Sequence, residues 1–114
     1  MPVDDRLRIG VVQAGSNVVI QLHGELDLAS APAFNSQFEE IRAGDPAAII
    51  VDLSELEFMD STGLRSVLMA RERCTQGGQR FAVVPGGRQV SRLLEIARVE
   101  RHLNLISSPA ELTG

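Results

Sequence analysis

The sequence contains no lysine, no tryptophan and no tyrosine, and all eleven of its basic residues are arginines. Without a lysine amine, the chain can form neither a Schiff base nor the phosphate-binding loop that relies on lysine. Its aromatic residues are four phenylalanines, which are too few to predict stacking platforms for single-stranded nucleic acid. These absences exclude several classes of enzyme and of nucleic-acid-binding protein.

Cysteine and histidine are scarce as well. The single cysteine, Cys74, excludes an internal disulfide bond and a zinc site built from several cysteines. His23 and His102 have no neighbours at metal-ligand spacing, so we predict no metal site and no cofactor.

The sequence contains no run of about 18 apolar residues, so it predicts no membrane span. The charged segment 1–8 lacks the apolar centre of a signal peptide. We therefore expect a cytoplasmic protein that does not contact membranes.

The composition predicts one globular domain. The chain has 114 residues, of which 44% are hydrophobic and 23% are charged. A net charge of −4 argues against direct binding to nucleic-acid backbones, which attract basic surfaces.

The hydrophobic pattern predicts strands that alternate with helices. We expect strands at 7–12, 18–22, 47–51 and 81–84, with a further short strand possible at 103–106. We expect a helix that starts after Ser30 as its N-cap and is stopped by Gly44, helices at 61–74 and 90–97, and a terminal turn at 109–112. The predicted fold is α/β, with a mostly parallel sheet of four to five strands, an N-terminal hairpin and about four helices. We expect a loop at 52–60, and the connections at 24–30, 52–62 and 85–88 then mark the end of the sheet where such folds place their sites.

The segment from Asp52 to Leu68 is the most informative part of the sequence. Ser61 and Thr62 stand where the predicted loop becomes a helix, so a hydroxyl there, or the carboxylate of Asp60, can cap free backbone N–H groups. The same N–H groups and the helix dipole can hold a phosphate. Gly63 has no side chain, which lets a partner's backbone approach closely. One of Phe58 and Met59 is expected to face solvent, as suits protein recognition.

These residues carry a family resemblance. The run MDSTGL follows an apolar strand and Asp52-Leu53-Ser54, and Gly24-Glu25-Leu26-Asp27 and Pro32 lie upstream. This pattern resembles the STAS domain of bacterial anti-sigma factor antagonists over about residues 7–108. The resemblance implies a STAS-like fold and one domain over residues 1–114.

The resemblance also implies partner switching. In that family, a serine is phosphorylated by an anti-sigma factor that is itself a serine kinase, and a metal-dependent serine phosphatase removes the phosphate. The unphosphorylated antagonist binds the anti-sigma factor and frees the sigma factor. In this chain the matching acceptor is Ser61, with Thr62 as the alternative. The protein is then a substrate and binding partner, not an enzyme.

Residues around the acceptor are the predicted partner-binding set. Asp27 matches the family's loop acid near the acceptor, and Arg65 departs from the small residues common at its position, so it can pair with a phosphate or alter partner choice. The complete predicted set is Glu25, Asp27, Met59, Asp60, Thr62, Gly63, Arg65 and Met69. We expect a monomer or a weak dimer.

Other functions fit the residues less well. A nucleophilic role for Ser61 lacks the glycine-flanked serine turn of α/β-hydrolases and a base fixed nearby. An aspartyl-phosphate receiver centred on Asp52 lacks both the acidic pair and the lysine of that class. A STAS scaffold in a signalling assembly, or a STAS domain that accompanies a membrane transporter, stays open as the alternative.

Overall fold

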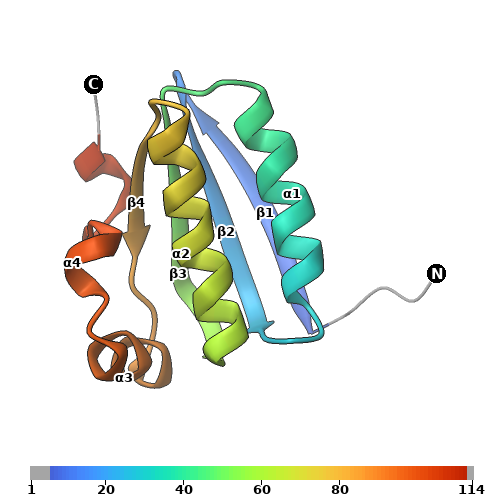
Figure 1. Cartoon of the computed structure of the whole chain (residues 1–114), viewed down its shortest axis with the longest axis vertical. Coiled ribbons are helices and arrows are strands. Elements are labelled where there is room, and N and C mark those ends of the chain that lie inside the picture. The colour runs from blue at the N-terminus through green and yellow to red at the C-terminus, as the bar shows by residue number, and fades with distance from the viewer. Residues whose placement is uncertain (1–5, 113–114) are drawn as a thin grey trace.

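The computed structural model describes residues 6–112 as one sheet with helices packed on it (Figure 1). The strands are β1 (Leu7–Ala14), β2 (Asn17–Leu26), β3 (Ala48–Met59) and β4 (Arg80–Val84). The helices are α1 (Ala31–Ala43), α2 (Ser61–Gln76), α3 (Arg88–Ala97) and α4 (Glu100–Leu103), followed by a 3-10 turn, η1 (Pro109–Leu112). No helix among residues 6–112 is long and apolar enough to cross a membrane. The domain predicted over residues 1–114 includes 1–5 and 113–114, which lie outside the described residues.

The strand order in the sheet is β1-β2-β3-β4. β1 and β2 form an antiparallel hairpin, and β2, β3 and β4 are parallel neighbours joined by helical connections. The predicted α/β fold with an N-terminal hairpin is confirmed.

Alternating side chains give the sheet two apolar faces. One face, covered by α1 and α2 (Figure 1), carries the main core, in which Ile20, Val51 and Phe34 are fully buried. The opposite face carries a smaller cluster that includes Val19 and Ile50 and is closed in part by Leu112 of η1. The two faces explain why the central strands read as nearly continuous apolar runs.

The predicted loop at 52–60 is wrong, because β3 continues to Met59 and pairs with β2 up to Leu26. Exposed polar residues such as Ser54 and Glu55 interrupt the apolar pattern, so the sequence did not predict that the strand continues. The ladder also shifts register between Gln21 and His23 and between Gly24 and Glu25, which breaks the simple two-residue period. Glu25 therefore lies at the end of β2 and not in a loop.

The possible fifth strand at 103–106 is wrong as a strand. Residues 100–103 form α4, and Asn104 adopts a left-handed conformation with φ 53° that turns the chain. Leu105 then makes a single parallel bridge with Val83. The sheet accordingly has four strands over the described residues.

A charged cluster joins α1 to α2. Glu39 of α1 accepts hydrogen bonds from Arg42 Nε at 2.9 Å and from Arg73 Nη2 of α2 at 2.6 Å. The hydrogen bond from Arg42, followed by that from Arg73, lowers the pKa of Glu39. Because Glu39 and Arg73 are both about half exposed, we expect this link to orient the two helices more than to stabilise them.

Cys74 of α2 is buried against the main core. Burial raises the pKa of its thiol to about 11. Since the thiolate is the reactive form, the native thiol should react at pH 8 roughly a hundredfold more slowly than a free cysteine. We expect an aromatic disulfide reagent to label the protein rapidly in urea and only slowly under native conditions. Rapid, complete labelling of the native protein would contradict the buried position.

Candidate functional site

The ends of β2 and β3 meet the start of α2 at one edge of the fold, and Ser61 is the first residue of that helix. Its side chain is exposed, and within residues 6–112 its hydroxyl makes no hydrogen bond. Thr62, the alternative acceptor, is half-buried. Of the two hydroxyls, that of Ser61 is the better placed for chemistry by another protein.

Asp60 caps α2 and ties it to a neighbouring loop. Its Oδ1 accepts a hydrogen bond from the backbone N–H of Gly63 at 2.8 Å, and its Oδ2 accepts one from the N–H of Leu28 at 3.2 Å. Asp60 N–H in turn donates to the carbonyl of Leu26 at 3.3 Å. The cap is therefore Asp60, one of the alternatives that the sequence left open, and this leaves the hydroxyl of Ser61 free.

Asp27 organises the loop between β2 and α1. Its Oδ1 accepts hydrogen bonds from the N–H groups of Ala29 and Ser30, and its Oδ2 lies 3.4 Å from Arg6 Nη1. Ser30 precedes α1 as predicted, but its hydroxyl does not cap the helix: it donates to the carbonyl of Glu25 and accepts from Asp27 N–H. The carboxylate of Asp27 thus supports the loop that Asp60 binds.

Gly63 is required by packing within the chain. A Cβ atom at this position would lie 2.2 Å from the carbonyl oxygen of Leu26, so a side chain there would force β2 and α2 apart. Gly63 is buried, and the backbone that approaches it belongs to β2. The expectation that a partner's backbone uses this space is therefore wrong.

Met59 and Phe58 divide as expected, one inward and one outward. Phe58 is 39% exposed, whereas Met59 is fully buried in the main core. The prediction that Met59 contacts a partner is wrong for its side chain, because alternation at the end of β3 directs it inward. Phe58 is the apolar side chain of this pair that a partner can reach.

The remaining predicted residues fall into two places. Arg65 and Met69 lie one and two turns after Ser61 on the outside of α2, where Met69 is 58% exposed. They line a shallow hollow of about 330 Å³ with Leu68, Glu72, Arg73 and Gln76. Glu25 is half-buried on β2 and lines a different hollow with Arg6, Arg8, His23, Gly24 and Glu57.

Sequence reasoning missed two residues beside the acceptor. Leu28 is 73% exposed in the loop held by Asp60, and nothing in the local sequence distinguishes it from a core leucine. Gln89 of α3 brackets the backbone of Met59: its Oε1 accepts from Met59 N–H at 2.9 Å, and its Nε2 donates to the Met59 carbonyl at 2.8 Å. This pair of bonds fixes the chain two residues before Ser61, over a separation of 30 residues in sequence.

The site presents side chains that another protein can recognise. No group of three or more histidine, cysteine or acidic side chains within residues 6–112 is arranged to hold a metal ion. What the site presents is an exposed hydroxyl on a rigid helix start, an acidic residue beside it, and the exposed apolar side chains of Leu28 and Met69.

The family model described as "Mlab, STAS domain" matches residues 9–107. The chain belongs to the STAS domain family. A relative of this STAS domain is the anti-sigma-F factor antagonist RsfB of Mycobacterium tuberculosis. It is 30% identical over 115 residues, an alignment that covers the whole of this chain and 93% of the relative.

Solved structures share the fold of this STAS domain. An anti-sigma factor antagonist from Mycobacterium paratuberculosis has a TM-score of 0.86 at 24% identity, covering 97% of this chain and 94% of the other. The anti-sigma factor antagonist SpoIIAA in its unphosphorylated form has a TM-score of 0.76 at 22% identity, covering 91% of each chain. The phosphorylated form of Bacillus SpoIIAA has a TM-score of 0.69 at 21% identity, covering 91% of this chain and 95% of the other.

The assignment of the helix cap can be tested by mutation. Asp60→Ala removes the acceptor for two N–H groups and should lower the free energy of unfolding by about 1–2 kcal/mol. Ser61→Ala, the matched control, removes a hydroxyl that caps nothing and should change it by less than about 0.5 kcal/mol. Urea unfolding followed by circular dichroism measures both. A larger loss for Ser61→Ala than for Asp60→Ala would reverse the assignment.

Proposed function

We propose that this STAS domain is an anti-sigma factor antagonist, a binding protein and not an enzyme, that works in the cytoplasm. It binds an anti-sigma factor through the surface around Ser61, and this binding frees the sigma factor. The observation that carries the proposal is the exposed, unbonded hydroxyl of Ser61 at the first position of α2. The antagonist name of the 30% identical relative supports the same function.

The surface around Ser61 has the composition of a recognition site. Leu28 and Met69 are the most exposed apolar side chains near it, at 73% and 58%. Exposed apolar side chains of this kind gain free energy when a partner removes them from water. Arg65, on the same side of α2, adds a charge that selects a partner with a complementary acidic group.

Phosphorylation of Ser61 is the proposed switch. The anti-sigma factor, acting as the kinase, transfers the γ-phosphoryl group of ATP to Ser61 Oγ; ADP leaves and the hydroxyl proton is released. A serine phosphatase later hydrolyses the ester and restores the hydroxyl. The phosphate adds about −1.5 to −2 charge to a surface on which Asp60 already carries one.

The fold can accept this charge without rearrangement. The first N–H groups of α2 and the positive end of its dipole favour a phosphate at this position. Arg65 lies four residues after Ser61, at a spacing that lets oppositely charged side chains meet on one helix face. The switch therefore acts on the partner's affinity and not on the folding of the antagonist.

Substitution of Ser61 tests the charge mechanism. Ser61→Asp should weaken binding to the anti-sigma factor about a hundredfold, since a loss of ~3 kcal/mol at the interface has that effect. Ser61→Ala should bind as the wild type does, and circular dichroism should show all three proteins equally folded. Titration calorimetry with the purified anti-sigma factor measures the affinities. Equal affinities for wild type and Ser61→Asp would reject the mechanism.

The acceptor can be identified in the protein taken from its own cells. Trypsin cleavage after Arg42 and Arg65 gives one peptide whose hydroxyl residues are Ser54, Ser61 and Thr62. We expect mass spectrometry to find phosphate on Ser61, in an amount that changes with growth and stress. Phosphate on Thr62 would move the acceptor by one residue. Phosphate under no condition, together with no binding to an anti-sigma factor, would favour the scaffold or transporter-associated role.

A further inference from the structure

The two edges of the sheet differ in whether another segment of the chain covers them. The outer edge of β4 is covered by the chain itself: Val83 N–H donates to the carbonyl of Asn104 at 3.2 Å, and Ile106 N–H donates to the carbonyl of Val83 at 3.0 Å. Figure 1 shows this C-terminal segment beyond β4, while β1 lies at the opposite end of the strand order. Among the described residues, no strand pairs with the outer side of β1.

β1 has none of the features that protect an edge strand from pairing. Such strands are usually short, bulged, interrupted by proline or charged at their centre. β1 spans eight residues, LRIGVVQA, and pairs with β2 through a continuous register without a bulge. Its one charge, Arg8, stands near its beginning, and Val11 and Val12 in its second half are 46% and 45% exposed.

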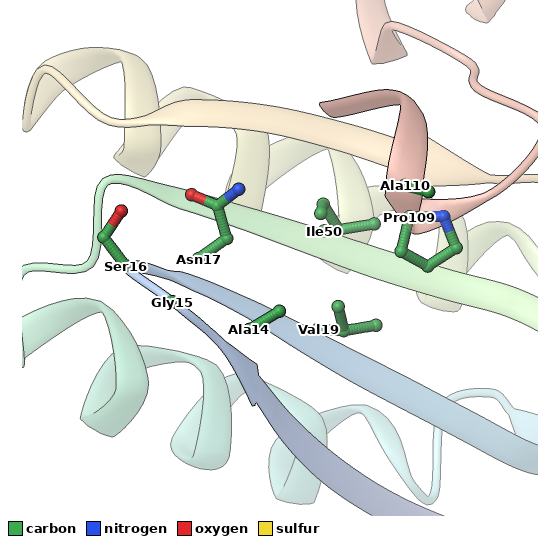
Figure 2. A pocket seen from close by; sticks show the side chains of 8 residues that line it. All are labelled: Ala14, Gly15, Ser16, Asn17, Val19, Ile50, Pro109 and Ala110. Atoms are coloured by element: carbon green, nitrogen blue, oxygen red, sulfur yellow. The ribbon is translucent and has the colours of Figure 1, made fainter. Parts of the chain in front are cut away.

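Apolar surface continues inward from this edge. Val12 pairs with Val19 of β2, which lies on the smaller core face of the sheet. Figure 2 shows Val19 and Ile50 on neighbouring strands beside Pro109 of η1, where they line a groove of about 430 Å³ that has no charged residue among the side chains lining it. Val12 therefore extends the apolar surface on the groove side of the sheet, whereas Val11, which pairs with Ile20, faces the main-core side. Both valines stand on an open row of backbone donors and acceptors.

We propose that β1 is a dimerisation edge, on which β1 of a second copy of this chain pairs antiparallel about a two-fold axis at Val11. In this register the two Val11 side chains face each other, and Val12 lies opposite Gly10, which leaves room for it. Arg8 lies opposite Ala14, so no like charges meet. A strand that complements itself in this way favours a second copy over an unrelated peptide.

The dimer should be weak and independent of the switch. Pairing over residues 8–14 buries less than the ~800 Å² per partner found in typical stable complexes. Ser61 belongs to α2 and not to this edge, so the inference does not rest on the proposed function. Ser61→Asp should leave self-association unchanged even where it abolishes binding to the anti-sigma factor.

Sedimentation of the full chain tests the edge. We expect wild type to pass from monomer to dimer between about 10 μM and 1 mM. Val11→Lys places two ammonium groups face to face and should raise the dimer dissociation constant about tenfold or more. Ile96→Lys, at a 66% exposed position on α3, adds the same charge elsewhere and should change nothing. A monomer at all concentrations, or equal dimerisation by Val11→Lys, would overturn the proposal.

Cross-linking tests the register. In Val11→Cys the two thiols face each other across the axis, with Cα atoms about 4.5–5.5 Å apart, so mild oxidation should give a disulfide-linked dimer. In Val12→Cys, equally exposed, the two cysteines are offset along the strands and exceed the ~7 Å limit. The buried Cys74 should not interfere. Equal cross-linking of the two variants, or of neither, would reject the axis at Val11.

Discussion

The carboxylate of Asp60 is the interaction on which the candidate site depends. One oxygen holds the start of α2 through Gly63 N–H, and the other holds the β2–α1 loop through Leu28 N–H. A single side chain therefore sets the position of Ser61, the proposed acceptor, and of the exposed Leu28 beside it. Because Asp60 caps α2, the hydroxyl of Ser61 is not needed to cap the helix and is available for modification.

Close backbone contacts make the surroundings of this side chain rigid. Gly63 sits against the carbonyl of Leu26, and Gly86 sits against the carbonyl of Leu53, where a Cβ would lie 2.3 Å away. Gln89 then binds both backbone groups of Met59. With the end of β3 held from both sides, the proposed phosphate at Ser61 would change the charge of this surface without moving its backbone, and the proposed partner exchange would need no refolding.

Much of the fold could be predicted from the sequence. The apolar run at 47–51, the stripe of Phe34 and Phe38, and the break at Gly44 correspond to β3, α1 and the end of that helix. The exit of β3 could not be predicted, because residues 52–59 pair through backbone groups while several of their side chains are polar and exposed. The strand predicted at 103–106 is wrong for the opposite reason. Apolar side chains of this segment cover the β4 side of the sheet, but its backbone forms no strand.

The sequence by itself determined the alternation of strands and helices, the place of Ser61 at a helix start and the likeness to the STAS family, since these follow from short-range order and motif spacing. Only the tertiary structure decided which of the neighbouring polar groups is the cap, that Met59 is buried while Leu28 is exposed, and that one sheet edge is covered while β1 is open. The physical reason is that capping partners, burial and edge pairing depend on contacts between segments distant in sequence. The hydrophobic periodicity of the sequence does not predict those long-range contacts.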